Sequence, residues 1–236
     1  MFALNTPRPM ARSLRVLAAL LSYPDASLRG HLAEMRSLLG GERALADARL
    51  AEIGALIDTI ERADPLEAEA AYVELFDRGR STSLHLFEHV HGDSRERGPA
   101  MIDLGQTYAQ AGLALADGEL PDYLPVVLEF ASTQPPVEAQ AFLGEMAHSL
   151  NALFGALRER ESPYASVLGA LLDLAGEKAQ PVAPKAAAAE SLDESWEEPL
   201  AFDGCSTQGQ ARPGQPQPIH VIRNESRQPA QPGARA

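Results

Sequence analysis

Apolar residues recur along this chain at intervals of three and four positions, which is the period of one face of an α-helix. The pattern runs from Ala11 to about Gly176. No stretch alternates apolar and polar residues convincingly, as a half-buried β-strand would. We therefore expect an all-α fold, a single helical bundle of about eight to nine helices.

Residues that end and start helices divide this region into segments. Tyr23-Pro24 ends the first helix, and Gly40-Gly41 is expected to end the second. Asp64-Pro65 starts another, because an aspartate followed by proline is typical of a helix N-terminus. Pro121-Asp122 is likewise expected to cap the helix that begins at Tyr123. The expected helices cover residues 11–23, 25–41, 42–63, 65–78, 84–90, 99–117, 123–132, 137–160 and 163–176.

The composition changes after Gly176. Eight of the 18 prolines lie in residues 181–236, together with repeated glutamine, glycine, serine and alanine. Such a segment buries too little apolar surface to offset the entropy lost when it is ordered. We therefore expect a helical domain over residues 1–177 and a disordered tail over residues 178–236, with an acidic island around the only tryptophan, Trp196.

The charge balance limits the partners of this chain. It has 20 lysines and arginines against 33 aspartates and glutamates, a formal net charge of −13. Nucleic acid and anionic membrane surfaces are therefore not expected as partners, because phosphate binding needs a basic surface. A basic peptide or protein segment is expected instead, and the long-range field would speed its encounter with the chain.

The sequence also indicates a compartment. Cys205 is the only cysteine, so an internal disulfide and a pair of metal-binding cysteines are excluded, which fits a reducing environment. The apolar run from Val16 to Leu21 follows arginines, but it is too short to span a bilayer and no small-residue cleavage site follows it. We expect a cytoplasmic protein without direct membrane insertion.

The stretch from Tyr72 to Leu104 differs from the rest of the chain. It reads YVELFDRGRSTSLHLFEHVHGDSRERGPAMIDL and holds three of the six histidines and four arginines, interleaved with acidic and aromatic residues. Charged and imidazole groups are costly to bury without partners. This stretch is therefore either a solvated surface of ion pairs or a functional site.

One enzymatic hypothesis comes from the spacing of His85, Glu88 and His89, which is H-x-x-E-H. In inverted zinc peptidases, two histidines on one helix face bind zinc and the glutamate activates water. A zinc-dependent hydrolase is therefore the alternative function, provided that residues 84–90 are helical. No phosphate-binding glycine loop, G-x-S-x-G motif or dinucleotide fingerprint is present in the sequence.

The same stretch carries a resemblance to a known family. Tyr72–Leu104 resembles the signature of the NarJ-type chaperones of respiratory nitrate reductase, which belong to the TorD-like group of redox-enzyme maturation chaperones. A second block, Leu120–Phe130, resembles the P-D-x-L-P…L-E-F segment of that family. The segment Leu20–Pro24 and the tail segment Trp196–Pro199 agree with it too, so the resemblance spans roughly residues 12–205.

The resemblance implies an all-helical, cytoplasmic chaperone without enzymatic activity and without a cofactor of its own. Proteins of this type bind the catalytic (alpha) subunit of nitrate reductase, including its N-terminal peptide, while molybdenum cofactor is inserted. They do not remain in the finished membrane enzyme. A monomer and a dimer are both compatible with the resemblance, because TorD-like relatives can exchange helices between protomers.

We expect the client peptide to bind in a groove lined by the central stretch. Phe76, Leu84 or Phe87 would supply apolar contact, and acidic side chains would face basic client residues. Alternatively, the aromatic residues belong to the core and the acids only pair with neighbouring arginines. The candidate residues are Phe76, Arg78, Arg80, Leu84, His85, Phe87, Glu88, His89, His91, Asp93, Arg95, Arg97 and Glu129.

Overall fold

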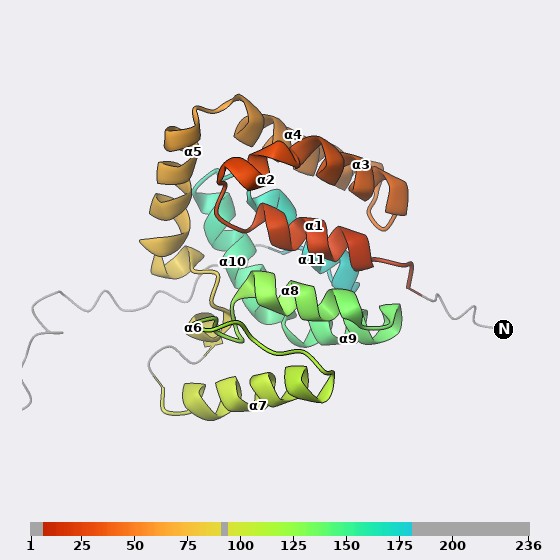
Figure 1. Ribbon diagram of the computed structural model, residues 1–236, viewed down its shortest axis with the longest axis vertical. Coiled ribbons are helices and arrows are strands. Elements are labelled where there is room, and N and C mark those ends of the chain that lie inside the picture. Colours follow the sequence, from red (N-terminus) through yellow and green to blue (C-terminus); the bar gives the residue numbers. More distant parts are fainter. Residues whose placement is uncertain (1–6, 91–93, 181–236) are drawn as a thin grey trace, which may run out of the picture. The chain divides into compact units, whose positions relative to one another are not determined.

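Eleven α-helices make up the fold over residues 7–90 and 94–180, the parts of the chain that the computed structural model describes. The same residues contain one π-helical turn, one 3-10 turn and no β-strand, so the expected all-α bundle is confirmed (Figure 1). None of the helices found there is both long and apolar enough to cross a bilayer. The expected tail, apart from its first residues 178–180, lies outside the described residues.

The helix α11 (Ala165–Ala175) is the centre of the bundle. Ten of its eleven residues are buried, and only Asp173 points to solvent, because its sequence is apolar on every side. Helices from both halves of the chain pack around it, and α1 packs along α8. The helices around α11 are α1 (Ala11–Leu20), α4 (Asp47–Arg62), α9 (Pro136–Glu145) and α10 (Ala147–Glu159), and α8 (Leu124–Thr133) packs on α1 and α9.

The N-terminal layer is completed by α2 (Ala26–Gly30) and α3 (Leu32–Glu42). Asp25 caps α2 by accepting a hydrogen bond from the Leu28 N–H at 2.8 Å. The helix α1 has no cap of its own, and Glu42 at the end of α3 supplies one from a distant part of the chain. Its carboxylate accepts the N–H groups of Arg12 and Ser13 at 3.1 and 2.7 Å.

Two expected helices are each broken in two, and this accounts for eleven helices where about nine were expected. The expected helix 25–41 is interrupted at His31, and the expected helix 137–160 at Met146; both residues have ψ near 0°, where the α-helical ladder stops. Gly40-Gly41 does not end α3 as expected. The helix continues through both glycines, and the left-handed Arg43 (φ 55°) ends it.

Five elements connect the N-terminal layer to α8. Asp64 caps α5 (Pro65–Tyr72) through the N–H groups of Leu66 and Glu67, as the sequence predicted. The helix runs on as a π-helical turn, which is followed by a 3-10 turn, α6 and α7. Their bounds are Val73–Asp77, Arg80–Thr82, Leu86–Val90 and Arg97–Gln110.

Candidate functional site

A buried carboxylate, Asp122, organises the surface around α6. Its side chain is fully buried, although it precedes α8 by only two residues. One carboxylate oxygen lies 3.3 Å from Nδ1 of His85, and the other accepts the N–H of Phe87 at 3.2 Å. Asp122 was expected to cap the helix that follows it, 123–132. That expectation is wrong, because the side chain turns to the first turn of α6 instead.

Backbone hydrogen bonds join the same two segments. The N–H of Leu86 donates to the Asp122 carbonyl at 3.0 Å, and the N–H of Leu124 donates to the Leu84 carbonyl at 2.9 Å. His85 and Tyr123 form an isolated β-bridge, with their rings 5.3 Å apart. The approach to α6 is therefore held against the start of α8 by main chain and side chain together, which sets the direction of α6.

The outer face of α6 is joined to its surroundings by its polar side chains. Nε2 of His89 lies 2.8 Å from the Ser83 carbonyl. Arg97, the first residue of α7, places its guanidinium 3.4 Å from Glu88 and 3.8 Å from Asp122. The beginning of α7 is therefore tied to α6 by an ion pair at the surface and by the buried carboxylate below it.

A tight turn precedes α6 and explains the glycine at position 79. The Thr82 hydroxyl donates to the Leu75 carbonyl and lies 3.2 Å from the carbonyl of Gly79. A Cβ on Gly79 would collide with the Thr82 hydroxyl and come within 3.0 Å of the Leu75 carbonyl. The π-helical turn can close onto the 3-10 turn only because position 79 has no side chain.

The sequence-predicted site residues divide into buried, half-buried and exposed groups. Phe76 and Leu84 are 4% and 3% exposed, so the structure places these two apolar candidates in the core instead of on a groove. Phe87, Glu88, His89, His85 and Arg97 are half-buried around α6. Arg78, Arg80, Arg95 and Glu129 are exposed, and Arg78 pairs with Glu74 at 3.0 Å. His91 and Asp93 lie outside the described residues.

The arrangement required for a zinc peptidase is not formed. The helix begins at Leu86, so His85 precedes it and does not share a helix face with His89. The His85 ring turns to Asp122, whereas the His89 ring turns to the Ser83 carbonyl. In the described part of the chain, no three His, Cys, Asp or Glu side chains are grouped closely enough to hold a metal ion.

The hydrogen bond to Asp122 raises the pKa of His85 above its ordinary value, against an opposing effect of burial. Folding therefore favours the protonated imidazole. The interaction of protonated His85 with Asp122 contributes fully to stability below the unfolded-state pKa of histidine, about 6.5. This contribution is lost as pH rises through the higher pKa of His85 in the folded state.

We expect His85→Gln to lower the free energy of unfolding more at about pH 5.5 than at about pH 8.5, because only the protonated imidazole carries that contribution. Urea unfolding of both proteins across this range measures the difference. His148→Gln, at an exposed position on α10, is the matched control. A loss that is equal at both pH values, or larger at the higher one, contradicts this assignment.

A second hydrophobic cluster lies between α6, α7, α8 and α9 and shares Phe142 and Met146 with the edge of the main core. Leu104, Tyr108 and Phe130 are its buried members. The ring of Phe130 lies 4.7 Å from that of Tyr108 and 4.9 Å from that of Phe142. Partly exposed side chains complete it: Phe87, Leu115, Val126, Phe142 and Met146.

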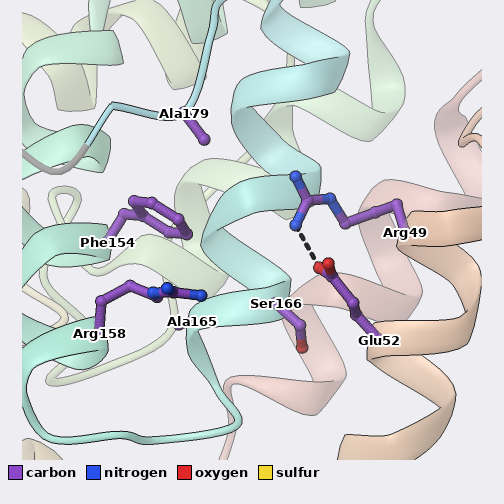
Figure 2. A pocket seen from close by; sticks show the side chains of 7 residues that line it. All are labelled: Arg49, Glu52, Phe154, Arg158, Ala165, Ser166 and Ala179. Atoms are coloured by element: carbon purple, nitrogen blue, oxygen red, sulfur yellow. Dashed lines mark hydrogen bonds and ion pairs between the residues drawn. The ribbon is translucent and has the colours of Figure 1, made fainter.

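Two hollows open elsewhere on the described surface. One, of about 310 Å³, lies between α4, α10 and α11 (Figure 2). Its Arg49 reaches Asp173 at 2.8 Å and Glu52 at 2.5 Å and lies against Gly169, so the guanidinium joins α4 to α11. Burial lowers the pKa of Arg49, and the two carboxylates more than reverse this. The other, an open groove of about 620 Å³, runs along α5 beside Tyr23, whose hydroxyl donates to Glu69.

Residues 42–169 match the family model described as nitrate reductase delta subunit, and this range includes α6, Asp122 and the second hydrophobic cluster. The chain belongs to the nitrate reductase delta subunit family. The resemblance inferred from Tyr72–Leu104 and Leu120–Phe130 is thereby confirmed.

Two bacterial relatives resemble this chain over most of their length. The "Nitrate reductase molybdenum cofactor assembly chaperone NarJ" of Escherichia coli K12 is 42% identical over 193 residues, which cover 78% of this chain and 82% of the relative. The "Probable nitrate reductase molybdenum cofactor assembly chaperone NarJ" of Bacillus subtilis is 32% identical, over 66% of this chain and 84% of the relative.

The fold also matches a solved structure. A "putative redox enzyme maturation protein" from Archaeoglobus fulgidus superimposes with a TM-score of 0.51 over 75% of this chain and 100% of that chain. The two sequences are 20% identical, so this likeness concerns the fold alone. It shows that the helical arrangement of this delta subunit family member recurs outside its close relatives.

Proposed function

We propose that this chain is an assembly chaperone for the catalytic subunit of a respiratory nitrate reductase. It acts in the cytoplasm and binds the catalytic subunit, including the N-terminal peptide of that subunit. Binding keeps the catalytic subunit competent for insertion of molybdenum cofactor. It carries no enzymatic activity and leaves when the enzyme is complete. The observation that carries this proposal is the 42% identity to the E. coli assembly chaperone across 82% of that protein.

The structure supports a binding role over a catalytic one. The imidazoles of His85 and His89 are turned to structural partners, and the chain is strongly acidic, which favours the approach of a basic client segment. The surface around α6 combines a half-buried aromatic, Phe87, with the carboxylate of Glu88. Apolar anchors with charged rims are what an amphipathic client helix requires.

Co-purification tests the proposal. The chain should retain the full-length catalytic subunit when both are co-expressed, and retain much less of a subunit that lacks its N-terminal segment. Membranes containing the mature enzyme should hold none of the chain. Loss of all co-purification refutes the proposed function, and persistence of the chain in the mature enzyme indicates a permanent scaffold instead.

Point variants locate the surface. We expect Glu88→Gln and His89→Gln to weaken capture of the catalytic subunit while the urea unfolding midpoint stays close to that of the wild type, because both side chains lie at the surface of α6. Glu138→Gln, an exposed carboxylate on α9, is the matched control. Capture that falls only in proportion to stability would return both residues to a structural role.

A further inference from the structure

The helix α7 is held to the bundle by very little. Of its fourteen residues only Leu104 and Tyr108 are buried, at 8% and 2% exposure, whereas α11 buries ten of eleven. It lies at the edge of the bundle (Figure 1), and Ile102 on its outer side is 61% exposed. A helix of this length is marginal in water by itself, so the two buried side chains and a few polar contacts keep it in place.

The sequence of α7 weakens it further. Gly98 and Gly105 lie within the helix, and a Cβ at either position would meet no other atom within 4 Å, so packing does not require glycine there. Glycine inside a helix lowers helix stability because the unfolded chain gains backbone freedom. The residue before the helix, Glu96, makes no side-chain cap. Gly112 and Gly118, both at positive φ, allow sharp turns in the connection that follows.

Among the residues that the structure describes, the polar contacts of α7 with other elements lie at its two ends. The Tyr108 hydroxyl donates to the Pro121 carbonyl at 2.8 Å, and Arg97 pairs with Glu88 and lies 3.8 Å from the buried Asp122. Each such contact contributes little, because water replaces it when the helix lifts away.

The surface under α7 suits a helix other than α7. It is made of Phe130 at its centre and, around it, Phe87, Val126, Phe142 and Met146, which stay partly exposed with α7 in place. Aromatic and thioether side chains from α6, α8, α9 and the residue after α9 adapt to different partners, because methionine has many rotamers and aromatic rings offer broad faces. The structure itself shows an amphipathic helix seated on this surface.

We propose that α7 is a built-in occupant of a docking site for an amphipathic helix, and that a helix of the client replaces it. This inference rests on the proposed function and names the binding site for it. The contacts of α7 indicate which residues the client helix should carry. It should have a large aliphatic residue at the position of Leu104, an aromatic residue four positions after it, as at Tyr108, and a basic residue seven positions before it, as at Arg97. These three positions fall on one helix face.

Hydrogen exchange of the full-length protein tests whether α7 opens separately. The amides of α7 should exchange at least about tenfold faster than those of α11, through an opening that does not require global unfolding. Leu104→Ala should speed exchange in α7 by about 30-fold or more, since a buried leucine is truncated. Gly105→Ala should slow it about two- to fivefold. Equal exchange rates in α7 and α11 overturn the proposal.

A peptide-binding measurement tests whether a client helix replaces α7. The probe is a fluorescein-labelled peptide that spans the N-terminal segment of the catalytic subunit. If the peptide binds only the open state, its apparent affinity follows the open fraction. Leu104→Ala should then tighten binding and Gly105→Ala weaken it about two- to fivefold, in the same order as the exchange rates. Gly40→Ala, at an exposed helical glycine of α3 with nothing near its Cβ, is the matched control and should change neither.

Leu104→Ala and Gly105→Ala are expected to change the peptide affinity in opposite directions. A general loss of folding could not produce this result, because Gly105→Ala stabilises α7 and still weakens binding. If the chain captures the catalytic subunit but the peptide affinity is equal in all variants, the docking site under α7 is refuted and the proposed function stands. If Leu104→Ala instead makes the protein dimerise without binding the peptide more tightly, the site serves a second copy of the chain and the proposal for a client helix is wrong.

Discussion

Replacing Phe76 by alanine is expected to lower the free energy of unfolding by about 3–5 kcal/mol, the usual loss for a large aromatic in a packed core. Phe76 is buried between Tyr72 and Tyr164, with ring centroids at 4.8 and 5.1 Å. Its removal would leave a cavity between the π-helical turn and Tyr164, the residue before α11. Urea unfolding of Phe76→Ala and of the milder Phe76→Leu, which refills most of the volume, measures the effect.

The same variant decides between two roles for Phe76. As a core residue, it should affect client capture only as far as it affects stability, and Phe76→Leu should restore both. Phe87→Ala is the comparison, because Phe87 is half-buried on α6. It should cost less stability than Phe76→Ala and weaken client capture more. A stable Phe76→Ala protein that has lost client capture would instead place Phe76 on the binding surface, as the sequence pattern suggested.

Asp122→Asn is expected to lower the free energy of unfolding by about 2–4 kcal/mol. The buried carboxylate has two acceptor oxygens, and the amide that replaces it has one acceptor oxygen and one donor NH2 group. The carboxylate receives the Phe87 N–H and faces His85 on its other oxygen, with Arg97 nearby. An asparagine amide can accept on one side only, so one of these groups loses its partner at a site without solvent access.

The loss at Asp122 should be local as well as global. Amides in α6 should exchange faster than in the wild type even in the absence of urea, since the first turn of α6 loses the group that accepts its N–H. Asp103→Asn, on the exposed side of α7, is the matched control and should stay within about 0.5 kcal/mol of the wild type. Unchanged protection of α6 in Asp122→Asn would show that the main-chain bonds alone hold the site.

The sequence predicted the helices well wherever local rules decide them. Asp64-Pro65 begins α5 as expected, since an aspartate cap and a proline at the first helical position need no tertiary partner. The predictions were wrong at His31, where a helix breaks directly after Gly30, at Met146, where a second helix breaks, and at Gly40-Gly41, where α3 continues. A glycine therefore ends a helix in one place and is tolerated inside one in another, and the local sequence does not distinguish the two cases.

The candidate site shows the same division. Residue types and spacing directed attention to Tyr72–Leu104, and five of the residues expected there lie on α6 or beside it. The spacing of His85 and His89 was misleading, because it means a shared face only inside a helix, and His85 lies before the helix begins. Asp122 was expected to cap α8, the helix that follows it, but its side chain accepts the N–H of Phe87 in α6. The sequence does not show that α6 lies close to Asp122.

By itself the sequence determined the helical class, the family and the stretch that carries the most chemistry, because these depend on periodicity and on the identity and order of residues. Only the tertiary structure decided which of those side chains are exposed, that Asp122 lies beneath α6, and that α7 covers an aromatic surface with two side chains. Burial, capping by distant residues and loose packing depend on which helices meet, and segments such as 84–86 and 122–124 meet across more than thirty residues of chain.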